Sequence, residues 1–214
     1  MKAPFTTEQL FDVFAKYNLT LFPFQLIIIL AGFVCIYFLH SKKTIKNKII
    51  GCYLGILWMW IGSVYHLAFF SEINKLAYIF GGLFILQGLF IFINSLFGNN
   101  LEFSFSRKPK NFIAYFFILF GLIIYPVISY FTEGSLNKII ALGLPCPSAI
   151  FTFGFFILAG NKLPKYFLII PSLWSIIGLS AAINFGVYQD YFLIISAVIA
   201  DIFILKQHTK LVLA

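Results

Sequence analysis

The sequence predicts an all-α polytopic membrane protein with seven transmembrane helices, an outside N-terminus and an inside C-terminus. An amphipathic helix on the membrane surface is expected to precede the first span. Hydrophobic residues make up 61% of the 214 residues and charged residues only 10%, and the mean hydropathy is +0.98. A water-soluble domain of this composition would expose far too much apolar surface, so lipid is the expected solvent.

Seven apolar stretches are long enough to be spans, because a helix needs about 20 apolar residues to cross the roughly 30 Å hydrocarbon layer. They are residues 23–40, 49–70, 76–97, 112–131, 139–160, 166–186 and 191–205. The last is the shortest and contains an acidic residue. The predicted organisation is an interfacial helix in residues 1–22, a transmembrane domain in 23–205 and a cytoplasmic tail in 206–214.

Basic residues gather in every second gap between these stretches. One set of gaps contains Lys42, Lys43, Lys46, Lys48, Arg107, Lys108, Lys110, Lys162, Lys165, Lys206 and Lys210. The other set, with the N-terminal segment, contains only Lys2, Lys16, Lys75 and Lys138. Because positive loops stay in the cytoplasm, the N-terminus is predicted to lie outside. The net charge of +8 is therefore explained by the orientation of the chain in the membrane. The sequence has no clustered basic face of the kind that binds nucleic acid.

Residues 1–22 have the pattern of a short amphipathic helix. Thr6 and Gln9 have the spacing of a capping box, and Phe5 and Leu10 have that of a hydrophobic staple. Apolar side chains then recur on one face and charged side chains on the other. The pattern favours a membrane anchor, and the alternative is a lid over an outward-facing pocket.

The chain also contains a faint internal repeat. Trp58 and Gly62 in the second stretch have the same spacing as Trp174 and Gly178 in the sixth. Three helices, a linking fourth and three more in the same orientation would form a 3+1+3 parallel repeat. This arrangement resembles the sugar and amino-acid transporters of the PQ-loop class, although the chain contains no Pro-Gln pair.

The second stretch carries a stripe of small residues that ends at a histidine. At about 100° per residue, the stripe consists of Gly51, Gly55, Met59, Gly62 and His66, with Trp58 and Tyr65 at its edge. Small residues let backbones approach closely, so this face should meet protein. These glycines, with Gly81 and Gly82, suit contacts within the chain or between copies in a homo-oligomer. His66 either locks neighbouring helices together or contacts a solute.

Residues 143–148, Gly-Leu-Pro-Cys-Pro-Ser, place one cysteine between two prolines. Since prolines remove backbone donors, regular helix is expected to begin only near Pro147. The helix N-terminus would suit an anion or another polar group, unless the motif is only a proline-capped helix start. Ser148 and Thr152 follow on one face. No zinc-ligand spacing, phosphate-binding loop or hydrolase motif is present, so no metal-binding or cofactor-binding residues are predicted, and any cofactor is unknown.

Together these features predict a small-solute transporter or channel with an outward-facing polar site between the second, fifth and sixth spans. Its expected lining residues are Trp58, Tyr65, His66, Cys146, Ser148, Thr152 and Asn184. Asp201 either couples transport to protons or pairs with a cytoplasmic lysine. One alternative is a membrane-embedded enzyme that uses Cys146 and His66. Another is a membrane sensor or assembly subunit.

Three segments resemble a known family. They are residues 5–11 (FTTEQLF), 58–70 (WMWIGSVYHLAFF) and 143–154 (GLPCPSAIFTFG). The chain is similar, from about Phe5 to the seventh span, to a group of bacterial polytopic membrane proteins known as domain of unknown function 6064. The resemblance implies a location in the bacterial inner membrane and no particular substrate.

Overall fold

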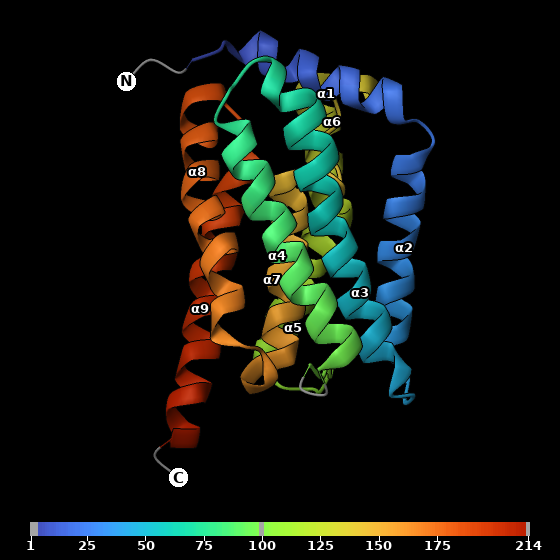
Figure 1. Cartoon of the computed structure of the whole chain (residues 1–214), viewed down its shortest axis with the longest axis vertical. Helices are drawn as coiled ribbons and strands as arrows, with labels where there is room; N and C mark the ends of the chain where they lie inside the picture. The colour runs from blue at the N-terminus through green and yellow to red at the C-terminus, as the bar shows by residue number, and fades with distance from the viewer. Residues whose placement is uncertain (1–3, 99–100, 213–214) are drawn as a thin grey trace.

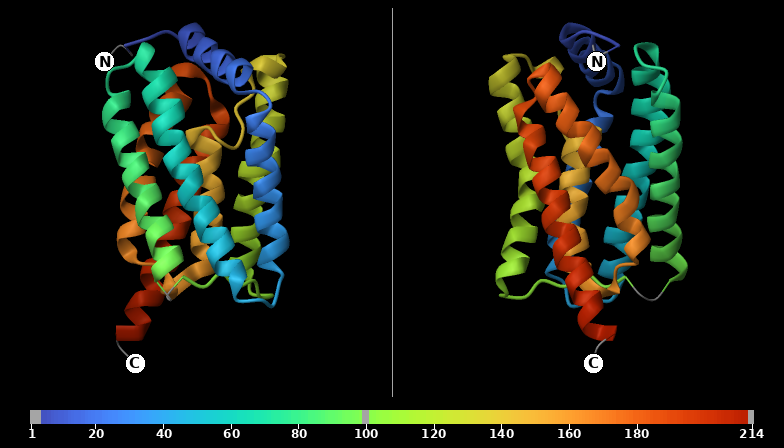
Figure 2. Two further views of the ribbon diagram at one scale, coloured as in Figure 1. Left: turned by 45° about the vertical axis from the view of Figure 1, so that its right-hand side comes forward. Right: turned by 90° about the vertical axis from the view of Figure 1, so that its left-hand side faces the viewer.

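The structure, a computed structural model, describes residues 4–98 and 101–212, and these residues form helices and no strand. Figure 1 shows α1 (Thr7–Leu21) lying across one end of a bundle whose other helices run roughly along its long axis. In Figure 2, the last part of α9 (Tyr191–Val212) projects from the opposite end. We call these two ends the α1 end and the basic end.

Seven further α-helices lie between α1 and α9 in the described part of the chain, and π-helix interrupts two of the helical segments. The helices are α2 (Phe24–Leu39), α3 (Ile45–Trp60), α4 (Ala77–Phe97), α5 (Pro109–Leu119), α6 (Tyr125–Glu133), α7 (Pro145–Ala159) and α8 (Ile169–Phe185). The π-helix η1 (Ile61–Phe69) extends α3, and η3 (Phe120–Ile124) joins α5 to α6. Pro126 has no amide to bond to the carbonyl four residues earlier, which accounts for the wider turn at η3.

Among the described residues, five helical segments are long and apolar enough to cross a membrane. They are Ile45–Glu72, Ala77–Phe97, Pro109–Glu133, Lys165–Phe185 and Tyr188–Lys206. The pair α1 and α2, bent by 87°, adds a sixth if it is one span, and α7 is apolar but shorter. The prediction of an all-helical chain with several apolar helices of membrane length is confirmed. Helix α9 continues to Val212, so it includes most of the predicted tail.

The helix in the fifth apolar stretch is shorter than residues 139–160. It begins at Pro145, two residues before the predicted start, and is 15 residues long. Residues 139–144 are irregular, and Gly143 has a φ of +102°, which residues with side chains rarely adopt. The Ser148 hydroxyl accepts a hydrogen bond from the Gly143 amide at 3.0 Å. The Gly-Leu-Pro-Cys-Pro-Ser motif therefore forms the turn that starts α7.

Helix α1 begins where its sequence pattern predicts and is fastened to the bundle on two sides. Thr6 and Gln9 form a reciprocal capping box, with hydrogen bonds of 2.8 Å and 3.2 Å. The buried face of α1 consists of Leu10, Phe11, Val13, Phe14 and Tyr17. On the polar side, Lys16 pairs with Glu72 at 2.6 Å, and Asp12 pairs with Lys138 at 3.5 Å.

The Tyr17 hydroxyl adds a buried link between α1 and the bundle. It donates a hydrogen bond to the Gly143 carbonyl oxygen at 3.0 Å and accepts one from the Trp60 indole nitrogen at 2.8 Å. The Tyr17 side chain is 1% exposed. One residue thus joins α1 to both α3 and the turn before α7.

Helices α3 and α4 approach each other closely along their glycines. A Cβ added to Gly55 would lie 2.9 Å from the Gly88 carbonyl oxygen, and one added to Gly62 would lie 2.7 Å from that of Gly81. The predicted glycine stripe therefore serves contacts within the chain. Gly82, by contrast, has open space where a Cβ would lie.

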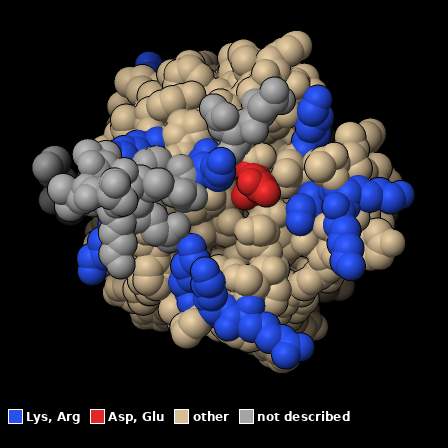
Figure 3. Space-filling model, turned by 90° about the horizontal axis from the view of Figure 1, so that it is seen from below, with Lys and Arg blue, Asp and Glu red and all other residues tan. Residues whose placement is uncertain are grey.

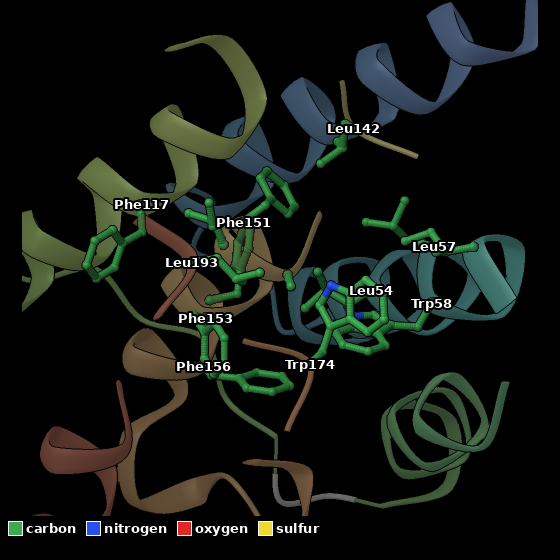
Figure 4. Packing of buried hydrophobic residues seen from close by; sticks show 14 of the residues in the cluster. Leu54, Leu57, Trp58, Phe117, Leu142, Phe151, Phe153, Phe156, Trp174 and Leu193 are labelled. Atoms are coloured by element: carbon green, nitrogen blue, oxygen red, sulfur yellow. The ribbon is translucent and has the colours of Figure 1, made fainter. Parts of the chain in front are cut away.

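Aromatic side chains of α7 fill the core between the cavity described below and the basic end. Phe151, Phe153 and Phe155 are 0% exposed, and Phe156 is 1% exposed. Figure 4 shows phenyl rings of α7 among side chains from α3, α5, α8 and α9. This half of the bundle is densely packed.

Lysine and arginine side chains are prominent at the end opposite α1 (Figure 3). The turns and loops of this end contribute Lys42, Lys43, Arg107, Lys108, Lys162 and Lys165. At the α1 end, Lys16 and Lys138 are each paired with an acidic side chain. The alternation of charge along the sequence thus becomes a difference between the two ends of the bundle.

Candidate functional site

A cavity of about 440 Å³ lies beneath α1. Pro4, Phe5, Leu10 and Phe14 form its roof. Its apolar and aromatic walls consist of Tyr65, Phe70, Leu76, Phe80, Ile140, Pro145, Trp174, Ile177, Gly178, Ala181, Phe185 and Val187. The volume is in the range that binds small molecules.

Four side chains with polar groups meet at the inner wall of the cavity: Tyr125, Cys146, Trp174 and Asp190. We call them the polar cluster. The Tyr125 hydroxyl donates a hydrogen bond to Asp190 Oδ1 at 2.5 Å, and the Cys146 thiol also contacts the Asp190 carboxyl group. The Trp174 indole nitrogen lies near Cys146 but makes no hydrogen bond of regular geometry within the described chain.

The Asp190 carboxyl group is buried without a counter-ion. Asp190 is 2% exposed, and no lysine or arginine in the described part of the chain forms an ion pair with it. Placing a charge within apolar surroundings is costly, so such a group is usually paired or serves a function. Its position in a cavity wall favours the second explanation.

The residues around the polar cluster lie where regular α-helix is interrupted. Tyr125 directly follows η3, and Tyr65 lies within η1. Cys146 lies in the first turn of α7, and Asp190 ends a short 3₁₀ turn before α9. Gly186, with a φ of +73°, ends α8 and lets the chain turn back toward that 3₁₀ segment. Irregular helix of this kind is frequent at functional sites.

Three of the predicted site residues line the cavity, namely Tyr65, Cys146 and Asn184. Cys146 is only partly buried because its side chain borders the cavity. Asn184 is exposed, and its side-chain amide donates to the Ser180 carbonyl oxygen at 2.7 Å. These three residues come from η1, α7 and α8, which lie in the second, fifth and sixth apolar stretches.

Trp58, Ser148 and Thr152 lie outside the cavity and join helices to each other. The Trp58 indole nitrogen donates to Thr152 Oγ1 at 3.0 Å, and the Thr152 hydroxyl donates to the Ser148 carbonyl oxygen at 2.7 Å. All three side chains are 0% exposed. Their hydrogen bonds are satisfied within the protein, so this structure gives them a role in packing α3 against α7.

His66 is 0% exposed and lies behind Trp174, outside the cavity lining. Aromatic rings surround it, with centroid distances of 4.7 Å to Phe84 and 5.2 Å to Trp174. Neither ring nitrogen has a hydrogen-bond partner among the described residues. The expectation that His66 faces protein is met, but the helix-locking hydrogen bond is not formed in this structure.

Asp201 lies on α9, away from the cavity lining. Its Oδ2 accepts a hydrogen bond from the Ser172 hydroxyl at 2.9 Å, which joins α9 to α8. Within the described residues it forms no ion pair with a lysine. Proton coupling through Asp201 stays a prediction.

Sequence reasoning missed Tyr125 and Asp190 as site residues. In the sequence, Asp190 lies between the sixth and seventh apolar stretches, where an acidic residue is ordinarily solvated, and Tyr125 stands out only through Pro126. One sequence pattern could have pointed to these residues. A tyrosine precedes a proline within the fourth apolar stretch, and an acidic residue precedes the seventh. The pattern does not reveal that the two side chains meet.

The geometry makes two suggested chemistries less attractive. In the first turn of α7, prolines at 145 and 147 remove two amide donors, and Asp190 lies beside Cys146, so the helix start is a poor anion site. No hydrogen bond joins Cys146 to His66 among the described residues, because both nitrogens of His66 are without partners. No group of three potential metal ligands occurs in the described part of the chain.

Comparison with known proteins identifies the family of the chain but no activity. A family model described as "Family of unknown function (DUF6064)" matches residues 7–213, and the chain belongs to this family. No curated protein and no solved structure matches the chain. Any function therefore has to be argued from the cavity.

Proposed function

We propose that this member of the family transports a small solute, which binds from outside the cell in the cavity beneath α1. The observation that carries the proposal is a cavity of about 440 Å³ whose inner wall holds a buried carboxyl group without a counter-ion. A cavity walled by apolar side chains with a few convergent polar groups is typical of small-molecule sites. Sites of this kind in transporters are often built from interrupted helices, as η1, η3 and the start of α7 are here.

In this proposal the bundle has seven spans, with the α1 end outside and the basic end in the cytoplasm. The spans are α2, α3 with η1, α4, α5 to α6, α7, α8 and α9, and α7 is short because the irregular segment before it completes the crossing. The lysines and arginine of the basic end support this orientation. A location in the bacterial inner membrane and a 3+1+3 repeat belong to the same proposal.

Helix α1 would then act as a lid as well as an anchor. Phe5 stacks on Phe185 at a centroid distance of 4.9 Å and meets Phe70 edge-on at 5.4 Å, so it covers part of the cavity. On the other side, the buried phenylalanines of α7 leave the basic end closed. The conformation supports a solute site reached from the α1 end, and transport requires a second conformation that opens toward the basic end.

An uptake experiment with a matched pair of variants tests the proposal. Purified chain is reconstituted in liposomes, incubated with a bacterial metabolite extract, and the solutes retained inside are identified by mass spectrometry. Ala181→Phe places a ring in the cavity, whereas Ile183→Phe changes a side chain of the same helix that is 66% exposed. We expect at least one solute to enter with the unmodified chain and with Ile183→Phe, but not with Ala181→Phe. Equal uptake by Ala181→Phe would contradict the proposal.

The enzyme alternative has one supporting observation, which is that Cys146 borders the cavity. The group beside the thiol is the Asp190 carboxyl group and not an imidazole, since no hydrogen bond joins His66 to Cys146 among the described residues. Conversion of a metabolite in the same experiment, abolished by Cys146→Ser, would favour the enzyme. Binding without uptake or conversion would favour a sensor or assembly subunit.

A further inference from the structure

We propose that the cavity selects an amphipathic organic cation, that is, a molecule with an aromatic or aliphatic body and one protonated amine. The proposal rests on the solute site proposed above and names the class of its occupant. It follows from the charge of the cavity, the free acceptor capacity of Asp190 and the nature of the walls.

The cavity lining has one carboxyl side chain and no basic side chain among the described residues. Asp190 is the sole aspartate or glutamate among the described lining residues, and no lysine or arginine is among them. Among the described lysines, Lys16 is the nearest in sequence to the roof. It forms an ion pair with Glu72, and neither residue lines the cavity. A cation entering the cavity would therefore supply the counter-ion that Asp190 lacks within the protein.

The Asp190 carboxylate has acceptor capacity to spare. An ionised carboxyl group offers about four acceptor positions. The protein supplies two donors to it, the Tyr125 hydroxyl and the Cys146 thiol. A protonated amine has up to three donors, so it can occupy the remaining positions without displacing either protein group.

The walls suit the rest of such a molecule. Trp174, Tyr65, Phe70 and Phe80 present aromatic surfaces to the cavity, and aromatic faces attract cations as well as apolar groups. Apart from the polar cluster and Tyr65, polar side chains among the described lining residues occur only at Asn74, Ser180 and Asn184, so a sugar would leave many of its hydroxyl groups unpaired. An anion would meet the carboxylate of Asp190 without any compensating basic side chain in the lining.

Three probes with the same carbon skeleton test the class of ligand. 2-Phenylethylamine carries a cation, 2-phenylethanol is neutral and phenylacetate is an anion. Their binding to the purified full-length chain in detergent is measured by calorimetry. We expect the amine to bind at least about tenfold more tightly than the alcohol, and phenylacetate not to bind, because a charge-assisted hydrogen bond is the difference between them.

Two acid-to-amide variants assign the preference to Asp190. Asp190→Asn should weaken amine binding at least about tenfold and leave alcohol binding within about twofold. Asp12→Asn, which changes an acid of α1 outside the cavity lining, should change neither. N-methyl and N-acetyl derivatives of the amine make the same comparison on the unmodified chain, since only the first keeps the charge. This second measurement holds even if Asp190→Asn does not fold.

The outcomes separate the ligand class from the site itself. Equal binding of amine and alcohol, or equal binding of the two derivatives, would overturn the cation proposal. If Ala181→Phe nevertheless abolished that binding, the solute site would stand. Binding of no probe at all, or binding unaffected by Ala181→Phe, would count against both.

Discussion

The half of the bundle beneath α1 and the half nearer the basic end are built from the same helices but packed in opposite ways. In the basic half, Phe153 and its neighbours on α7 are fully buried and fill the space between helices. In the α1 half, the start of α7 borders a cavity, and Cys146 is open to it. The difference teaches that one helix can serve as core at one end and as part of a site at the other.

The change from one packing mode to the other follows the backbone. Regular α-helix of α3, α5 and α7 forms the packed half, whereas η1, η3 and the Pro145 turn lie toward the cavity. The tightly packed side chains of the basic half are expected to contribute more to stability than the side chains of the cavity walls. Four predictions test this division.

The largest expected effect is in the packed half. Phe153→Ala should lower the free energy of unfolding by about 3 kcal/mol, because it leaves a hole that the surrounding helices cannot fill. The comparable change in the cavity wall, Ile177→Ala, should cost about 1 kcal/mol or less, because that side chain already borders empty space. Unfolding of each variant by SDS in mixed micelles gives both values. Equal losses would show that the two halves do not differ in packing.

The next prediction concerns the link between α1 and the bundle. Tyr17→Phe removes the hydrogen bonds to the Gly143 carbonyl and from the Trp60 indole, and should cost about 2 kcal/mol. Loosening α1 should also speed the reaction of Cys146 with a maleimide. The reaction rate is measured in a Cys35→Ala, Cys52→Ala background, since these are the other two cysteines. An unchanged rate would mean that α1 does not control access to the cavity.

A substitution at His66 is expected to raise the free energy of unfolding, in contrast to the two preceding predictions. His66→Leu replaces an imidazole that has two unpartnered nitrogens, so the free energy of unfolding is expected to rise by about 1 kcal/mol. The same micelle unfolding experiment measures it, with Trp58→Phe as a control that loses the satisfied hydrogen bond to Thr152 and should be destabilised. A clear loss of stability in His66→Leu would indicate that the imidazole is bonded to a group or water absent from this structure.

The smallest effect is expected at the exposed ion pair of α1. Glu72→Gln breaks the ion pair with Lys16. The Glu72 side chain is 46% exposed and the Lys16 side chain is 55% exposed. Exposed pairs contribute little, so the change in unfolding free energy should be below about 0.5 kcal/mol and should vanish at high salt. A larger effect would mean that the lid is held mainly by charge and not by Tyr17 and the apolar face of α1.

Local sequence patterns predicted the helices well. The Thr6 capping box, the glycine stripe of α3 and η1, and the late start of α7 depend on neighbours in the chain, and each is present. Periodicity also placed His66 correctly toward protein. The number of helices of spanning length is less definite, because α7 is short and α1 bends sharply into α2.

The candidate site was predicted only in part, because it depends on how separate helices meet. Ser148 and Thr152 looked like ligand groups on a helical wheel, yet they use their hydroxyl groups on local hydrogen bonds. Asp190 looked like a loop residue, yet the 3₁₀ turn brings it to Tyr125, which is 65 positions earlier in the chain. The periodicity of a single helix does not show which residues of two separate segments come into contact.

The roof formed by Phe5 has a consequence for the speed of binding. If α1 acts as the proposed lid, that ring must leave Phe185 and Phe70 before a molecule enters. Entry would then wait for the N-terminal helix to lift, and the waiting time would not depend on how many molecules are present. The observed association rate should consequently rise with ligand concentration at first and then level off at the frequency with which the roof opens.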